Sequence, residues 1–212
     1  MNIGTPKRVY RQSVRAAAAE ATRERIIDAF ANCFRGQWFD EIRLDDVARE
    51  AGVTIQTVLR RFGSKEGLIN ALHERLGDEI QQRRRVRPGE AGAAISVLID
   101  DYEQVGDLVV RTLAQEDRYP AIHAITDVGR AAHRAWMADA FAPWLTPLAE
   151  DARTRALDGL IVASDVYVWK LLRKDMRRSI SDYREQMEKL SAAALGVPRA
   201  TLFPQPAHGG LK

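Results

Sequence analysis

The sequence has little cysteine, no long apolar run and no pattern typical of β-strands. The single cysteine among 212 residues, Cys33, excludes an intramolecular disulfide and lies in an apolar helical pattern, which indicates a core thiol. No window approaches the ~18 apolar residues that a membrane span needs, and the N-terminus lacks an apolar signal stretch. We therefore expect an all-α, cytoplasmic protein that has no membrane partner.

Motifs of catalysis and of cofactor binding are also missing. The chain has no glycine-rich phosphate loop, no Gly-x-Ser-x-Gly elbow and no His-Glu-x-x-His pair. His123 and His133 are ten residues apart, which is a poor spacing for two metal ligands on one helix. We therefore expect that the protein is not an enzyme and that it binds neither a metal ion nor a cofactor.

Charge is distributed unevenly along the chain. Residues 1–90 carry 17 Lys and Arg against 13 Asp and Glu, which gives +4, whereas residues 91–212 carry 15 against 16, which gives −1. A basic N-terminal part is compatible with a polyanionic partner and equally with an ordinary solvated surface.

Apolar residues at three- and four-residue spacing predict helices throughout the chain. The predicted helices cover residues 22–36, 44–51, 55–62, a segment from Lys65 onward, and about 91–114, 120–141, 153–175 and 180–195. The composition predicts a flexible basic arm at 1–20, a first domain at 21–82, a second at 90–197 and a loosely ordered tail at 198–212. The domain boundary is expected near Pro88.

Residues 45–64 have the pattern of two helices packed across a tight turn. Gly52 supplies the left-handed conformation of the turn, and Ala48 is small where the second helix crosses. Val47, Ala51, Val53 and Val58 are expected to face inward. Thr54 is a candidate N-cap of the second helix.

This arrangement leaves a polar and basic surface on the second helix. An α-helix fits the major groove of DNA, and residues near its N-terminus then meet base edges. The alternative is an ordinary helical hairpin with a solvated basic face. The candidate DNA-binding residues on this helix are Thr54, Ile55, Gln56, Thr57, Arg60 and Arg61.

Three segments together resemble the DNA-binding domain of the TetR family of transcriptional regulators. They are RIIDAF at 25–30, DVAREAGVT at 46–54 and TVLRRFGSKEGL at 57–68. The resemblance covers about residues 22–76 and implies a three-helix head, a linking fourth helix and an all-helical body that binds a ligand and dimerises. It also implies that Lys65 grips a DNA phosphate, as suits a lysine at a helix N-terminus.

The sequence departs from the family pattern at four positions. Leu59 stands where an aromatic residue is expected to touch the DNA backbone, and Arg61 replaces the more usual histidine. Trp38 occupies the usual glycine position after the first helix. Arg43 stands where a threonine normally caps the second helix, so it either reaches a phosphate or remains exposed without a contact.

The predicted helix at 153–175 is apolar nearly all round, so it must be covered on two faces. A second copy related by a two-fold axis would cover one of these faces together with the helix at 180–195, whereas a fully internal core helix is the alternative. The candidate dimer residues are Leu157, Leu160, Ile161, Ser164, Val168, Leu171, Tyr183, Met187 and Leu190.

Aromatic and histidine side chains in the second domain are candidates for an apolar ligand pocket, with plain core packing as the alternative. The candidate pocket residues are Tyr102, His133, Trp136, Met137, Phe141 and Trp169.

The resemblance implies a sequence-specific transcriptional regulator, expected to be a repressor that a small molecule releases from a palindromic operator. Its expected partners are double-stranded DNA, a second copy of the chain and an unidentified small-molecule effector. The alternative is a helical protein-interaction module of the same fold that no longer binds DNA.

Overall fold

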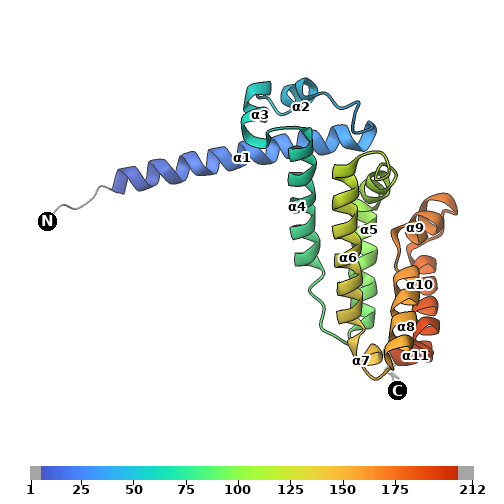
Figure 1. Cartoon of the computed structure of the whole chain (residues 1–212). Coiled ribbons are helices and arrows are strands. Elements are labelled where there is room, and N and C mark those ends of the chain that lie inside the picture. The colour runs from blue at the N-terminus through green and yellow to red at the C-terminus, as the bar shows by residue number, and fades with distance from the viewer. Residues whose placement is uncertain (1–5, 205–212) are drawn as a thin grey trace, which may run out of the picture. The chain divides into compact units, whose positions relative to one another are not determined.

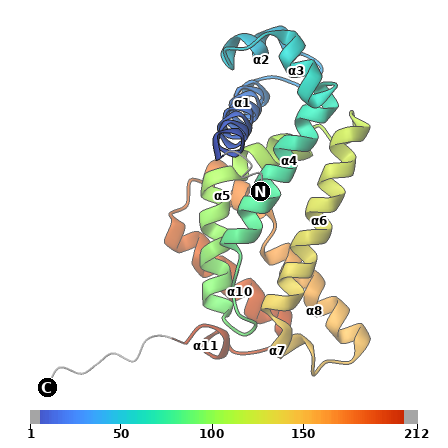
Figure 2. The ribbon, with the colours of Figure 1, turned by 90° about the vertical axis from the view of Figure 1, so that its left-hand side faces the viewer.

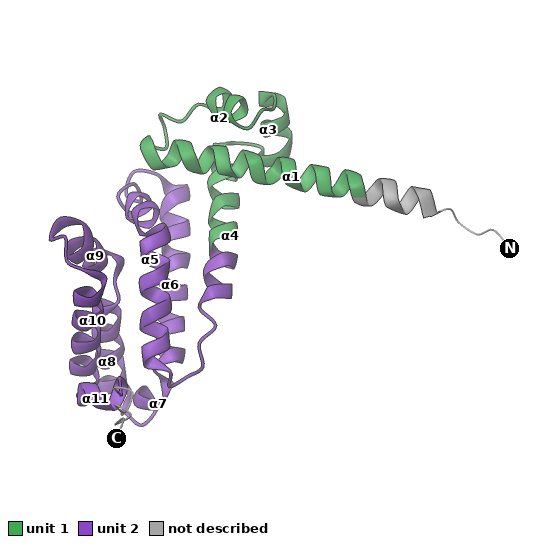
Figure 3. Ribbon diagram, turned by 180° about the vertical axis from the view of Figure 1, so that it is seen from behind, with its two compact units in different colours: residues 1–76 green, residues 77–212 purple. Residues whose placement is uncertain are grey.

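The computed structural model describes residues 6–204, with side chains from Val14 onward. This part of the chain is helical and contains no strand, which confirms the predicted all-α class (Figure 1). Two compact units divide the chain, Met1–Leu76 and Gly77–Lys212 (Figure 3). No helix over residues 6–204 combines the length and the apolarity that crossing a bilayer requires.

The first unit contains α1 (Pro6–Gly36), α2 (Leu44–Glu50), α3 (Ile55–Phe62) and the first turns of α4 (Lys65–Arg83). Helix α2 packs on both α1 and α3, and Figure 1 shows α2 and α3 together along one side of α1. Burial of apolar side chains from all four helices holds the unit together. Its fully buried large side chains are Ile26, Ile27, Phe30, Phe34, Leu68 and Ile69.

Residues 6–20 belong to α1, so the flexible arm predicted for residues 1–20 is wrong over this range. The run of alanines at 16–19 and the interspersed arginines have high helix propensity, which lets the helix extend before its buried part begins. Residues 1–5 lie outside the described residues.

The boundary between the units falls within α4, after Leu76, and not near Pro88. Arg83 and Arg84, at the C-terminal end of α4, both pair with Asp101 of the next helix. These long-range contacts assign the end of α4 to the second unit, and sequence periodicity carries no information on them.

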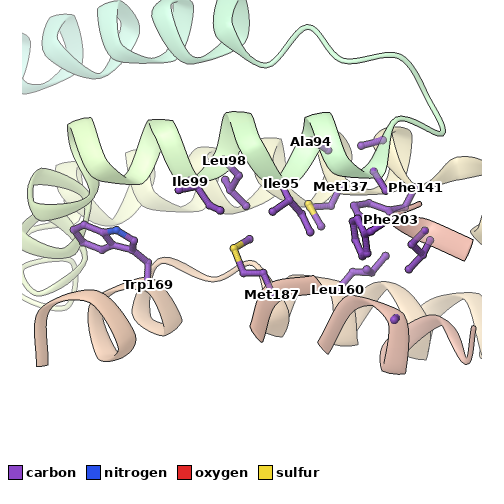
Figure 4. Packing of buried hydrophobic residues seen from close by; sticks show 14 of the residues in the cluster. Ala94, Ile95, Leu98, Ile99, Met137, Phe141, Leu160, Trp169, Met187 and Phe203 are labelled. Atoms are coloured by element: carbon purple, nitrogen blue, oxygen red, sulfur yellow. The ribbon is translucent and has the colours of Figure 1, made fainter. Parts of the chain in front are cut away.

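The second unit contains eight described elements in addition to the last turns of α4. They are α5 (Ala91–Leu113), α6 (Pro120–Ala140), α7 (Ala142–Leu145), α8 (Glu150–Ala163), α9 (Val166–Trp169), the π-helix η1 (Lys170–Asp175), α10 (Ile180–Leu195) and α11 (Arg199–Leu202). Helix α10 packs on α8 and α5, and α6 packs on α5 and α8 (Figure 2). In the shared core, Ile95 and Leu98 of α5 point toward Leu160 of α8 and Met187 of α10 (Figure 4).

The single helix predicted at 153–175 is wrong, because the chain breaks at Ser164 and Asp165. The carbonyl of Ser164 accepts a hydrogen bond from the Tyr102 hydroxyl at 2.9 Å. Asp165 begins a new helix as its N-cap, accepting from the amide of Tyr167 at 2.7 Å. A continuous apolar pattern concealed this break.

Part of the predicted loose tail is ordered. Helix α11 follows Pro198, and Leu202 and Phe203 are buried in the core of the second unit. Arg199 donates to Glu188 of α10 at 2.9 Å, which fixes this end of the chain on α10. Residues 205–212 lie outside the described residues.

Candidate nucleic-acid interface

The turn between α2 and α3 has the geometry of a helix-turn-helix. Gly52 adopts φ +66°, a left-handed conformation that glycine reaches at low steric cost. The amide of Val53 donates to the carbonyl of Ala48 at 2.9 Å and so closes the turn. Thr54 caps α3 by accepting from the amide of Thr57 at 3.3 Å, as the sequence predicts.

Small and branched side chains pack α2 against α3. Val47, Ala48, Ala51 and Val58 are buried, as the sequence predicts, whereas Val53 is half-buried. Because Val58 is the inward residue of α3, Gln56 and Arg60, two residues before and after it, turn away from the core of the first unit. Arg61 is exposed near the C-terminal end of α3. The packing therefore determines which face of α3 is presented to a partner.

The outer face of α3 is basic and polar. Gln56, Arg60 and Arg61 are exposed, and none of them has an ion pair or a side-chain hydrogen bond with the described residues. Arg43, the residue before α2, is likewise exposed and without such a partner among the described residues. Three unneutralised guanidinium groups are thus available to a polyanion.

The remaining candidates on α3 are less exposed. Ile55 and Thr57 are half-buried, and Thr54 is exposed. The hydroxyls of Thr54 and Thr57 lie 3.0 Å apart in a hydrogen bond, so both already serve the N-terminus of α3. Their contribution to binding a partner would come from their outer atoms and from the backbone at the helix start.

Lys65 has contacts that the sequence analysis does not anticipate. Its ammonium donates to the backbone carbonyls of Asp40 and Ile42, both at 3.1 Å, and lies 5.0 Å from the centre of the Phe39 ring. The expectation of a phosphate grip stays untested, but two of the three N–H donors are used within the protein. Pattern matching places a lysine here without revealing these acceptors.

Polar contacts between helices fix the frame that carries α2 and α3. Arg75 of α4 donates to Asp28 at 2.7 Å and to Glu24 at 3.2 Å, both on α1. Glu50 at the end of α2 accepts from α1 and also lies near the half-buried thiol of Cys33. Burial and Glu50 raise the pKa of the Cys33 thiol, so the reactive thiolate is disfavoured at neutral pH.

The candidate pocket residues of the second unit are buried or half-buried. Tyr102, Met137, Phe141 and Trp169 are buried in its core, and His133 and Trp136 are half-buried. One small gap between these helices, within the described part of the chain, does not admit a water molecule. Its lining is apolar except for two serines, and consists of Ala94, Ile95, Leu98, Met137, Phe141, Ser164, Met187 and Ser191.

Several candidate pocket residues instead form a polar network. His133 Nε2 lies 2.9 Å from the Ser164 hydroxyl, and its Nδ1 lies 3.3 Å from the Arg84 guanidinium. The indole N–H of Trp136 donates to the Arg84 carbonyl at 2.8 Å. Burial and the charge of Arg84 lower the pKa of His133 to about 3, so the ring is neutral at physiological pH.

No cluster of three or more histidine, cysteine or acidic side chains suited to a metal ion gathers within the described part of the chain.

Trp169 donates its indole N–H to Glu103, and its ring fills the space beside Gly106. This side chain thus completes the core of the second unit.

The structure also corrects the predicted dimer surface. Leu160, Ser164, Tyr183 and Met187 are fully buried within the chain, because α8 and α10 pack on each other and on α5, so their side chains cannot contact a second copy. Leu157, Ile161 and Val168 are half-buried. Leu171 and Leu190 remain exposed, and the same helices add exposed apolar side chains at Val162, Tyr167 and Ile180.

These observations define an all-helical protein with an N-terminal helix-turn-helix unit and a larger helical second unit. The sequence model of the bacterial regulatory proteins of the tetR family matches residues 26–72, which contain α2 and α3. Residues 26–72 are thus similar to the corresponding part of TetR-family regulators.

Curated relatives match in this same region. The chain is 33% identical over 82 residues to the HTH-type transcriptional regulator AlkX of Mycobacterium tuberculosis, which is 37% of this chain and 39% of AlkX. It is 44% identical over 57 residues to the HTH-type transcriptional regulator SrpR of Pseudomonas putida, 27% of either chain. The chain thus spans less than half the length of these relatives.

Solved structures share the fold over most of the chain. A TetR-family regulator from Streptomyces coelicolor has a TM-score of 0.63 at 20% identity, and the match covers 90% of this chain and 92% of that chain. A putative TetR-family regulator from Rhodococcus sp. has a TM-score of 0.66 at 16% identity, covering 82% and 98%. The match to each of these two structures extends beyond the helix-turn-helix and includes most of the second unit's fold.

Proposed function

We propose that the chain is a sequence-specific DNA-binding transcriptional regulator that inserts α3 into the major groove of a palindromic operator. The observation that carries the proposal is the outer face of α3, where Gln56, Arg60 and Arg61 are exposed and have no partner among the described residues. The closed turn at Gly52 and the cap at Thr54 hold this helix on the surface of the head.

Each exposed side chain has a chemical role at the groove. Gln56, in the first turn of α3, is suited to the paired donor and acceptor of adenine, and Arg60 to the two acceptors of guanine. Arg61 and Arg43 supply charge for phosphates, which positions the protein without selecting a sequence. Leu59 provides no hydroxyl for such a contact.

We infer that two copies bind one operator, since a two-fold dimer reads a palindrome with half-sites about 34–36 Å apart. Support comes from the exposed apolar side chains of Val162, Leu171, Ile180 and Leu190, which a second copy would cover.

We infer further that a small molecule releases the protein from DNA, as in a repressor. The structure of the multidrug binding protein EbrR complexed with imidazole has the same fold, with a TM-score of 0.57 at 19% identity. An effector that binds in the gap lined by Leu98, Met137 and Phe141 would have to displace side chains, because that gap is too small to admit a water molecule.

Binding selection from random duplex DNA tests the proposal. The purified protein should enrich one short inverted repeat. Arg60→Ala and Gln56→Ala should each lower the preference for that repeat by about 1–3 kcal/mol, because each loses contacts to a base edge. Binding would be measured on the selected repeat and on scrambled duplex at one salt concentration.

Arg134→Ala is the matched control, since it removes an exposed arginine of α6 that pairs with Asp158. It should leave the preference unchanged. Enrichment of no sequence by the wild-type protein would favour the protein-interaction module. Equal losses on selected and scrambled DNA for both α3 variants would refute base reading by this helix.

A further inference from the structure

The ammonium of Lys65 connects the start of α4 to residues 37–43, the loop that joins α1 to α2. Two carbonyl acceptors in this loop, those of Asp40 and Ile42, each lie 3.1 Å from Nζ. The ammonium also makes a cation–π contact with the Phe39 ring, whose centre lies 5.0 Å from Nζ. All three contacts are made without DNA.

Two apolar side chains of this loop are buried and anchor it to the core of the first unit. Phe39 and Ile42 are 4% and 3% exposed, and their side chains belong to the core of the head. The backbone amide of Trp38 donates to the Glu41 carboxylate at 2.8 Å. Lys65 ties the backbone of this loop at Asp40 and Ile42 to the start of α4.

The Ile42 carbonyl belongs to the same peptide unit as the amide nitrogen of Arg43. Arg43 is the N-cap residue of α2, with φ −97° and ψ 133°, but its side chain makes no capping hydrogen bond. Holding the Ile42 carbonyl therefore restrains the peptide plane that leads into Arg43, whose guanidinium is exposed.

We propose that Lys65 is a positioning residue that aims Arg43 at a DNA phosphate and does not bind phosphate itself. The proposal rests on the proposed function, because it assigns a role within the same DNA contact. To reach a phosphate, the ammonium would have to leave two carbonyls and the Phe39 ring, and the loop that carries Arg43 would lose its tie to α4.

The dependence of operator affinity on salt distinguishes the two roles. Each phosphate contact contributes about 0.9 to the slope of log affinity against log salt. Lys65→Met keeps the apolar stem over Phe39 and removes the charge, and Arg43→Gln removes the charge that Lys65 is proposed to aim. Each single variant should reduce the slope by about 0.9, and the double variant should also reduce it by only about 0.9.

Arg61→Gln provides the matched control, because Arg61 lies on α3 and has no bond to the loop. Combined with Lys65→Met, it should reduce the slope by about 1.8, the sum of two independent losses. A general loosening of the head would treat Arg43 and Arg61 alike, so this contrast separates positioning from mere structural support.

Three results would overturn the proposal. An additive loss with Arg43→Gln would show that Lys65 is an independent phosphate contact. A less-than-additive loss with both partners would show general loosening. An unchanged slope in Lys65→Met alone would show that Lys65 has no part in binding.

Hydrogen exchange of the free protein tests the tie to the loop independently of DNA. Lys65→Met should speed amide exchange, relative to α3, at Glu41, Asp46 and Val47. The amide of Glu41 donates to the Trp38 carbonyl within the loop, and those of Asp46 and Val47 donate to the Arg43 carbonyl at the start of α2. If the wild type bound no operator, the proposed function and the aiming of Arg43 would both fail. If amide exchange in Lys65→Met were unchanged while the wild type bound its operator, the proposed tie between Lys65 and the loop would be overturned, and the proposed function would stand.

Discussion

At the scale of single residues, Gly67 lies where the backbone of α4 meets the end of α3. A Cβ built at Gly67 would overlap the backbone carbonyl oxygen of Phe62. The obstacle is backbone, so a rotamer change cannot relieve it. Absence of a side chain at this position lets α4 start directly after the turn at Gly63 and Ser64.

We predict that Gly67→Ala destabilises the head by about 1–3 kcal/mol, because the added methyl forces α3 and α4 apart. Urea unfolding followed by circular dichroism would measure the loss. Gly77→Ala is the control within the same helix, since a Cβ there meets nothing within 4 Å. It should stabilise by up to about 1 kcal/mol through better helix propensity. Equal stabilisation by both substitutions would contradict the close approach.

Several residue roles could be predicted from the sequence, and others could not. Gly52, Thr54 and Val58 have the predicted conformation, cap and burial, because each role follows from local spacing. The contacts of Lys65 could not be predicted, since its acceptors are carbonyls more than twenty residues away. Backbone acceptors leave no trace in side-chain patterns.

At the scale of elements, a buried ion cluster joins the end of α4 to α5. Asp101 is fully buried, and its two carboxylate oxygens accept from Arg83 at 2.6 Å and from Arg84 at 2.7 Å. Arg84 also lies over the Trp136 ring at 4.9 Å. A buried carboxylate is costly without partners, so these two arginines are what allow Asp101 to remain in the core of the second unit.

We predict that Asp101→Asn destabilises the second unit by about 3 kcal/mol, because it removes the buried charge that both guanidiniums face and leaves Arg83 only the longer pair with Glu79 at 3.9 Å. Unfolding in urea would quantify the loss. Asp158→Asn, which breaks the exposed pair with Arg134, is the control and should cost less than about 1 kcal/mol. A similarly small loss for both variants would show that the buried cluster contributes no more than a surface ion pair.

The order and bounds of most helices could be predicted, because amphipathic periodicity and glycine or proline positions are local signals. The predicted helices at 55–62, 91–114 and 180–195 agree with α3, α5 and α10 to within a residue. The break at Ser164 and Asp165 could not be predicted, since Ser164 there forms hydrogen bonds with the distant side chains of Tyr102 and His133. Tertiary contacts decide such breaks, and local composition does not.

At the scale of the whole molecule, the two units present different kinds of surface. The helix-turn-helix exposes unpaired arginines, whereas α8, η1 and α10 expose apolar side chains at Val162, Leu171 and Leu190. The sequence predicts a dimer contact in these helices but selects several residues that are buried in the chain's own core. A helix apolar on two faces does not reveal from sequence which face is covered internally.

We predict that Val162→Glu and Leu190→Glu each dissociate the proposed dimer, because each places a charge in the apolar contact. Light scattering over a concentration series would measure the mass. Leu160 is unsuitable for this test, since its burial means that a charge there would unfold the chain. Glu185→Lys, a charge change on the same α10 at a half-buried residue paired with Lys189, is the control. Dimers that persist in both variants would place the contact elsewhere.

In α3, the residues that hold the helix in place are different from those exposed on its outer face. This difference has a consequence for engineering and for divergence among operators. Buried Val58 and the turns at Gly52 and Gly63 determine the position and ends of α3. Gln56, Arg60 and Arg61 are exposed and have no side-chain partner among the described residues. A randomised library at these three positions can therefore be screened for new target sequences without a matching search for compensating core changes. The recognised DNA sequence can thus change while the fold of α3 and its turns stays the same.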